Sequence, residues 1–106
     1  MMPSPIQAYF DADKTDDLQA LTGAFASHAV VRDEGKTYAG KEAIEAWWRA
    51  AKAKYQSVVE PLGLDEQNEA IKVRARVSGN FPGSPATLTF AFKLAGDRIE
   101  ELEIAP

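Results

Sequence analysis

The sequence predicts an α+β fold in which three N-terminal helices pack on a strongly curved, mainly antiparallel β-sheet. In the first half of the chain, apolar residues recur at the helical spacings of three and four. In the second half they alternate with polar residues, which is the period of a strand with two different faces. The length of 106 residues suits a single domain, which we expect to span residues 1–106. Helices on one face of an antiparallel sheet are a stable solution for this order of elements.

Two helices are predicted before the first strand. Ser4 is a favourable cap for the first helix, Pro5 suits its first position, and Gln7 can close a capping box. The second helix is predicted to begin near Thr15, with Thr15 as its cap and two aspartates at its positive end. The apolar faces of these helices are formed by Ile6, Tyr9, Phe10, Leu18, Leu21 and Phe25.

A third helix is predicted to begin after Gly40 and has the clearest helical pattern in the chain. Two adjacent tryptophans, Trp47 and Trp48, are separated by about 100° around its axis. We therefore expect one to pack under the sheet and the other to line a pocket or reach the surface. The apolar side of this helix comprises Ile44, Trp47, Trp48, Ala51 and Tyr55.

The strands are predicted from β-branched and alternating segments. Residues 29–33 form a short first strand, and a turn at Glu34 and Gly35 leads into a partner. A strand at residues 57–60 is expected to bend or bulge at Pro61 and Gly63. Three further strands are predicted at residues 71–78, 87–94 and 98–104, with one face carrying Lys72, Arg74, Arg76, Thr87 and Thr89.

Composition excludes several classes of function. The chain has no cysteine and a single histidine, His28, so it lacks the usual ligands of a zinc site. The net charge of −4 disfavours nucleic acid as a partner. No phosphate-binding loop, dinucleotide-binding glycine pattern or serine nucleophile elbow occurs. No apolar run approaches the ~20 residues of a membrane span, and the N-terminus lacks a leader-like segment. We therefore expect a cytoplasmic protein without a membrane partner. We also expect no metal and no cofactor.

The order of elements and several segments resemble the nuclear-transport-factor-2-like superfamily, which includes ketosteroid isomerase and SnoaL-like proteins. The resemblance covers nearly the whole chain and implies a cone-shaped, cystatin-like α+β roll. It also implies a small apolar ligand in the cone and a homodimer formed through the outer face of the sheet. The segments that carry it are residues 9–10, 16–21, 25–33, 40–48 and 96–101.

The resemblance also implies a site. Tyr9 falls where ketosteroid isomerase has an oxyanion-hole tyrosine, and Asp33 falls where it has its aspartate base. The second oxyanion donor of that enzyme, an aspartate, falls near Phe90 here, so steroid isomerisation itself is disfavoured. From the residues alone, Asp33 also suits a turn next to Glu34 and Gly35, and Tyr9 also suits the core.

Aromatic residues are the candidates for the wall of the site. The predicted substrate-binding residues are Trp47, Trp48, Phe81, Phe90 and Tyr55. Each also has a simpler interpretation as part of the core, because aromatic stripes on helices and strands usually pack inward. We expect His28 at the surface or at a helix end, too poorly oriented to pair with Asp33 in an extended strand.

Two functions therefore remain open at this point. The first is a cofactor-free isomerase, cyclase, dehydratase or hydrolase with Asp33 as base and Tyr9 as hydrogen-bond donor. The second is a non-catalytic domain that binds a small ligand or forms a dimer. A cavity at Asp33 would favour the first, whereas a cone filled by aromatic side chains would favour the second.

Overall fold

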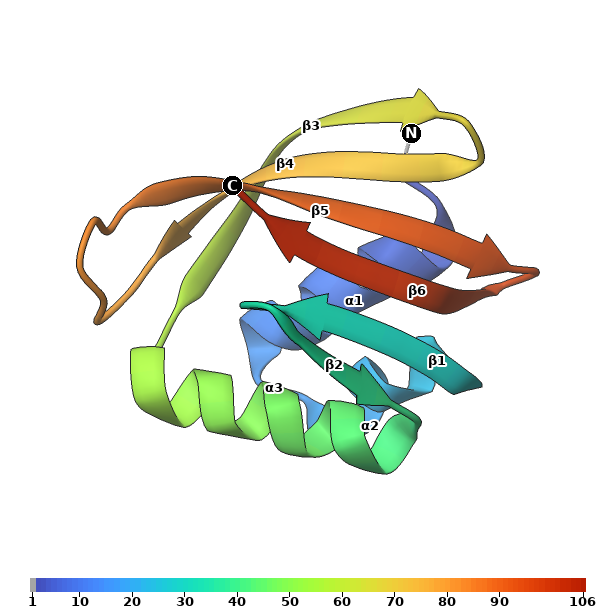
Figure 1. Ribbon diagram of the computed structural model, residues 1–106, viewed down its shortest axis with the longest axis horizontal. Coiled ribbons are helices and arrows are strands. Elements are labelled where there is room, and N and C mark those ends of the chain that lie inside the picture. The colour runs from blue at the N-terminus through green and yellow to red at the C-terminus, as the bar shows by residue number, and fades with distance from the viewer. Residues whose placement is uncertain (1) are drawn as a thin grey trace.

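The computed structural model describes residues 2–106 and confirms the α+β architecture. Three helices pack against one six-stranded sheet, which curves strongly across the molecule (Figure 1). The helices are α1 (Ser4–Thr15), α2 (Leu18–Gly23) and α3 (Lys41–Tyr55). The strands are β1 (Phe25–Asp33), β2 (Lys36–Ala39), β3 (Val58–Gln67), β4 (Ala70–Ser78), β5 (Ala86–Ala95) and β6 (Arg98–Ala105).

The sheet has the order β2-β1-β6-β5-β4-β3. All neighbouring pairs are antiparallel except β1 and β6, which run parallel inside the sheet. This pairing brings the first strand of the chain against its last one, and α1 lies behind β6 in Figure 1. The expected bulge in β3 is present as a shift of register between Pro61 and Gly63.

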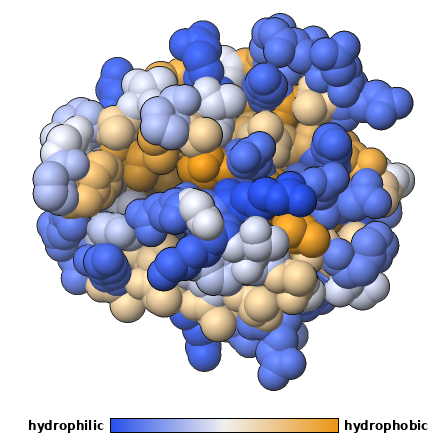
Figure 2. Space-filling model, in the orientation of Figure 1, coloured by the Kyte–Doolittle hydropathy of each residue, from blue (hydrophilic) through white to orange (hydrophobic). Residues whose placement is uncertain are grey.

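The alternating strands place their apolar side chains under the helices. In β4, Ile71, Val73, Ala75 and Val77 are buried, whereas Arg74 and Arg76 are exposed on the outer face. Arg74 pairs with Thr89 across the sheet. Figure 2 shows mainly hydrophilic side chains on the face turned away from α1, with hydrophobic surface between them. The apolar side chains of β4 therefore contribute to the core, and its outer face presents charges.

The starts of α1 and α2 differ from the sequence prediction. Pro3 occupies the cap position of α1 and no side chain caps that end, so Ser4 is already helical and the capping box is absent. Gln7 instead donates to Asp11, one turn further along the same helix. Asp17, and not Thr15, caps α2 by accepting the N–H of Ala20. The aspartate takes this position because α1 continues through Thr15 before the chain turns.

No helix within residues 2–106 is long and apolar enough to cross a membrane.

Candidate functional site

A tight hairpin fixes the position of Asp33. Asp33 is the last residue of β1 and pairs with Lys36 at the start of β2. The two residues between them, Glu34 and Gly35, have φ values of 53° and 76°. Positive φ at both central positions is typical of the two-residue turn that matches the twist of a hairpin. The turn interpretation of this segment is therefore correct, but the Asp33 side chain belongs to the strand.

The Asp33 carboxylate is half-buried and hydrogen-bonded. Trp47 of α3 donates its indole N–H to Asp33 Oδ2 at 3.0 Å. Burial raises the pKa of Asp33 above its ordinary value of 3.8, and the charge of Glu34 adds to this, while the Trp47 hydrogen bond opposes it. A carboxylate with a raised pKa is a better proton acceptor near neutral pH than an exposed one.

Tyr9 lies in the middle of an aromatic cluster. The residue is 3% exposed. It packs against Phe10, Phe25, Phe90 and Phe92, with ring centroids 5.2 to 6.3 Å away. The rings meet mainly edge to face, which is a favourable arrangement for aromatic pairs. The interpretation of Tyr9 as a core aromatic is therefore correct for its ring.

The hydroxyl of Tyr9 lies in a buried environment near negative charge. It makes no side-chain hydrogen bond within residues 2–106. Burial raises the pKa of Tyr9 well above 10.0, and the charges of Asp13 and Asp33 raise it further. Tyr9 is therefore protonated at neutral pH, and its hydroxyl has no acceptor among residues 2–106.

The remaining predicted wall residues are packed into the structure. Trp47 and Trp48 are both buried, so neither reaches the surface. Phe90 is buried beside Tyr9, and its phenyl ring offers no hydrogen bond where the resemblance implies a second donor. Tyr55 donates to Glu34 Oε1 at 3.0 Å, and its ring contacts Phe81 edge to face. Their role toward a substrate stays a prediction.

Sequence reasoning missed one buried charged group, Asp13. Asp13 lies on α1 and is 6% exposed. Trp48 donates its indole N–H to Asp13 Oδ1 at 2.8 Å, and Lys52 Nζ lies 3.1 Å from Asp13 Oδ2. The spacing contained a signal, because Asp13 follows Tyr9 and Phe10 by four and three residues and so shares their apolar face.

A surface groove lies next to this charge network. Its volume is about 610 Å³, and it is bounded by α1, the end of α3, the start of β3 and the end of β4. The lining residues are Gln7, Phe10, Asp11, Asp13, Lys14, Lys52, Ser57, Val58, Val59, Glu60, Pro61, Arg76 and Ser78. None of the residues predicted for the site lines this groove, although Phe10 and Asp13 adjoin Tyr9 on α1.

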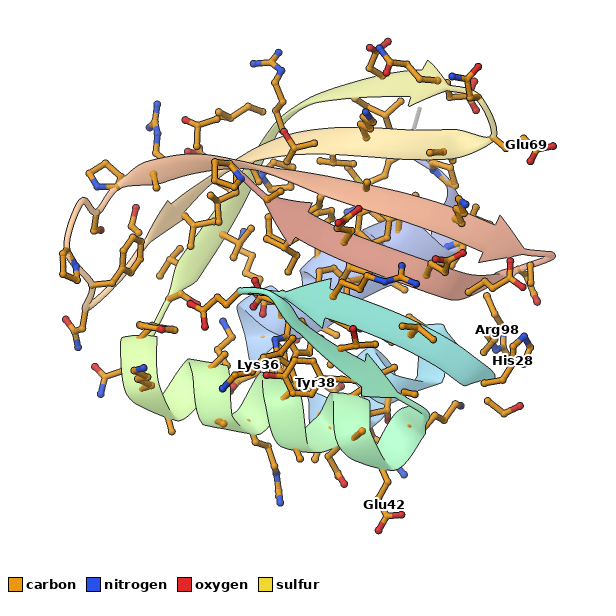
Figure 3. The ribbon with its side chains drawn as sticks, viewed as in Figure 1. His28, Lys36, Tyr38, Glu42, Glu69 and Arg98 are labelled. Carbon is orange, nitrogen blue, oxygen red and sulfur yellow. The ribbon has the colours of Figure 1, made fainter. Side chains whose placement is uncertain are left out.

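His28 lies away from these groups, as expected. Figure 3 shows it beside Arg98 at one end of the sheet, while Lys36 and Tyr38 of β2 lie along α3. Its side chain is 70% exposed, with Nε2 3.7 Å from Glu100 Oε1. Within residues 2–106, no group of three or more histidine, cysteine, aspartate or glutamate side chains could hold a metal ion.

Asp33 at the end of β1 supplies a proton acceptor, and Tyr9 on α1 supplies a hydrogen-bond donor. The charge of Asp33 is the smallest of the three causes that raise the pKa of Tyr9, and no hydrogen bond joins the two side chains within residues 2–106. Such a pair can remove a proton from carbon and stabilise the oxygen anion that results.

Comparisons with known proteins agree with this fold. A family model described as a SnoaL-like domain matches residues 6–102. A crystal structure of a candidate polyketide cyclase from Sinorhizobium meliloti is 48% identical, with a TM-score of 0.94, covering 97% of this chain and 94% of that one. No match is found among curated proteins.

More distant structures share the fold alone. One is a protein with a ketosteroid isomerase-like fold from Catenulispora acidiphila, in complex with trimethylamine. It is 19% identical, with a TM-score of 0.85, covering 100% of this chain and 87% of that one. Another is a computationally designed 17-OHP binder, 17% identical with a TM-score of 0.81, covering 99% of this chain and 92% of that one.

Proposed function

The chain belongs to the SnoaL-like domain family, and from this membership we propose that it is a cofactor-independent acid–base enzyme acting on a small, largely apolar carbonyl compound. The reaction class is proton abstraction next to a carbonyl group, as a ring-closing cyclase requires. The likeness to a candidate polyketide cyclase at 48% identity supports this choice among the activities that the fold hosts. The observation that carries the proposal is the half-buried carboxylate of Asp33, which accepts the indole N–H of Trp47 and whose charge contributes to the raised pKa of Tyr9.

Each residue has one role in the proposed step. The Asp33 carboxylate takes a proton from the carbon next to the carbonyl, and the bonding electrons move onto the carbonyl oxygen. Tyr9 donates a hydrogen bond to the enolate oxygen so formed. In a cyclase, the enolate carbon then bonds to a second carbonyl carbon of the same molecule. The resulting alkoxide takes back the proton from Asp33, which restores the carboxylate.

The energetic demand on Tyr9 is considerable. Loss of one preorganised oxyanion donor typically costs about 2.7–4 kcal/mol in the barrier. Phe90 cannot supply a second donor, so Tyr9 carries this task alone among the predicted site residues. A substrate whose enolate is already stabilised by a second carbonyl group needs less help. This favours dicarbonyl compounds over simple ketones as substrates.

Proton exchange tests the proposal without knowledge of the natural substrate. β-Tetralone is incubated with the protein in deuterated water, and loss of its α-proton signals is followed by NMR. We expect exchange catalysed by the wild-type protein and its loss in Asp33→Asn. Asp97→Asn, in the exposed turn after β5, is the matched control and retains the rate. Equal rates in the wild type and Asp33→Asn would refute Asp33 as base.

A non-catalytic ligand-binding domain is the second candidate. The packing of Phe10, Phe25, Phe90 and Phe92 around Tyr9 favours it, because these rings fill the cone. Binding of β-tetralone without any exchange of its α-protons would support this alternative. Saturable exchange would count against it.

We also propose a homodimer through the outer face of the sheet. The outer face of β4 carries Lys72, Arg74 and Arg76, whereas β6 carries Glu101 and Glu103. Two copies related by a twofold axis can place these rows of opposite charge against each other. Light scattering after size exclusion is expected to give twice the monomer mass, and Arg74→Glu to lower it. A monomeric wild-type protein at micromolar concentration would refute the proposal.

A further inference from the structure

The groove beside α1 is lined by both apolar and charged side chains. β3 leaves the C-terminal end of α3 and passes α1 (Figure 1), and the groove lies between them. Phe10, Val58, Val59 and Pro61 supply its apolar surface. Its volume of about 610 Å³ is within the range of pockets that hold small organic molecules.

The ammonium group of Lys52 has an N–H donor that no acceptor within residues 2–106 uses. This group has three N–H donors. One donates to Asp13 Oδ2 at 3.1 Å and another to the backbone oxygen of Ser57 at 2.9 Å. The third has no acceptor within residues 2–106. The Lys52 side chain is 18% exposed against 7% for Asp13, so Lys52 is the member of the pair that is more open to the groove.

The position of this ammonium group is fixed before any ligand arrives. Trp48 donates its indole N–H to Asp13 Oδ1, and Lys52 donates an N–H to Asp13 Oδ2. These contacts tie α1 to α3 and to the start of β3 at a single point. A donor that is already ordered loses little entropy when it binds an acceptor.

The other charged side chains at the groove are mostly committed to neighbours. Glu60 Oε1 lies 3.6 Å from Arg76 Nη1, and Asp11 accepts the side-chain amide of Gln7. Lys14 has no such partner within residues 2–106. Lys14 and Lys52 therefore leave N–H donors at the groove without an acceptor among residues 2–106, and a ligand that carries an acceptor can use them.

We propose that this groove binds a small molecule with an apolar body and an acceptor oxygen, either a carbonyl or a carboxylate, which takes the third N–H of Lys52. The apolar body lies on Phe10, Val59 and Pro61. This binding does not require catalysis at Asp33, so it holds for a binding protein as well as for an enzyme.

Three probes of similar shape test the proposal: naphthoate, acetylnaphthalene and naphthalene. They supply a carboxylate, a carbonyl and no acceptor, respectively. Binding is followed by amide chemical shifts in NMR titrations of the intact protein. We expect naphthoate or acetylnaphthalene to shift the amides of Phe10, Val58 and Ser78 and to bind more tightly than naphthalene. Which of the two binds better distinguishes a carboxylate from a neutral carbonyl ligand.

The decisive variant is Asp13→Asn/Lys52→Met. It removes both charges together and leaves an amide oxygen to accept from Trp48. We expect the Kd of the preferred probe to rise about tenfold, as for a lost hydrogen bond to a charged group, while naphthalene binding changes little. Lys54→Met, which removes an exposed lysine on the same helix, is the matched control and keeps the Kd.

Three outcomes would overturn the proposal. The first is a Kd in the double variant equal to that of the wild type, with the fold intact by NMR. The second is absence of binding by all probes up to their solubility limits, and the third is chemical-shift changes confined to residues outside the groove. Titration of Asp33→Asn separates this test from the proposed reaction, because that variant is expected to lose proton exchange and to keep probe binding.

Discussion

Trp48 donates its indole N–H to Asp13 across 2.8 Å, which joins the middle of α3 to α1 inside the protein. The preceding residue, Trp47, makes the same kind of bond to Asp33 at 3.0 Å. Two adjacent tryptophans therefore each satisfy one carboxylate, on different sides of the same helix. The two acceptors differ in burial, since Asp13 is buried and Asp33 is half-buried.

This difference predicts unequal effects of two matched substitutions. In Trp48→Phe, a buried carboxylate oxygen loses its donor, which is expected to lower the free energy of unfolding by about 1–3 kcal/mol beyond the lost packing. In Trp47→Phe, water can replace the indole N–H at Asp33, so the loss is smaller. Both indoles are almost fully buried, so the packing contributions are similar. Urea unfolding of both variants measures the difference, and equal losses would contradict it.

The Asp13–Lys52 pair predicts a non-additive response. Lys52→Met leaves a buried carboxylate without its cation, which is expected to cost about 3 kcal/mol of stability. Asp13→Asn/Lys52→Met removes the uncompensated charge and is expected to recover most of this loss. Urea unfolding of the wild type, Asp13→Asn, Lys52→Met and the double variant gives the coupling energy directly. A double variant that is less stable than Lys52→Met would show that the pair is not the cause.

The raised pKa of Asp33 predicts a dependence of stability on pH. A carboxyl group whose pKa is higher in the folded state binds its proton more tightly there than in the unfolded chain. Its contribution to stability is therefore largest below the unfolded value near 3.8 and is lost as the pH rises through the folded pKa. The amide that Asp33→Asn introduces does not titrate, so this variant lacks that contribution at every pH.

We therefore expect Asp33→Asn to gain stability relative to the wild type as the pH rises through that interval, and to level off above it. The amide oxygen of the new side chain can still accept the indole N–H of Trp47. The difference in pH dependence between the two proteins therefore reports the titration of Asp33 and not the loss of this hydrogen bond. Thermal or urea unfolding of both proteins at a series of pH values measures the difference. A relative loss of stability with rising pH would mean that the pKa is lowered in the folded protein.

Local patterns were enough to predict most of the fold. The alternation in β4 and β5 and the helical spacing in α3 each reflect a face that must be buried. The bulge at Pro61 and Gly63 followed from their poor fit to a regular ladder. The parallel pairing of β1 with β6 was not predicted from the residues, because it joins segments about seventy positions apart with no local turn to signal it.

The candidate site was less predictable than the fold. Asp33 and Tyr9 were identified through a resemblance, and their surroundings depend on which side chains fill the space between α1, α3 and the sheet. Asp13 was missed although its spacing placed it on the apolar face of α1. Its partners, Trp48 and Lys52, lie on another helix, and the sequence of α1 contains no information about them.

Tyr9→Phe separates the structural role of this residue from its proposed chemical one. The ring contacts remain, and the hydroxyl has no partner within residues 2–106 to lose, so the urea midpoint is expected to change little. Proton exchange of β-tetralone is expected to fall by about 100-fold or more, as for removal of one oxyanion donor. Tyr38→Phe is the matched control, because Tyr38 packs on Trp47 near Asp33 but has no role in the proposed step. An unchanged exchange rate in Tyr9→Phe, with Asp33→Asn inactive, would leave Asp33 as base and remove Tyr9 from the mechanism.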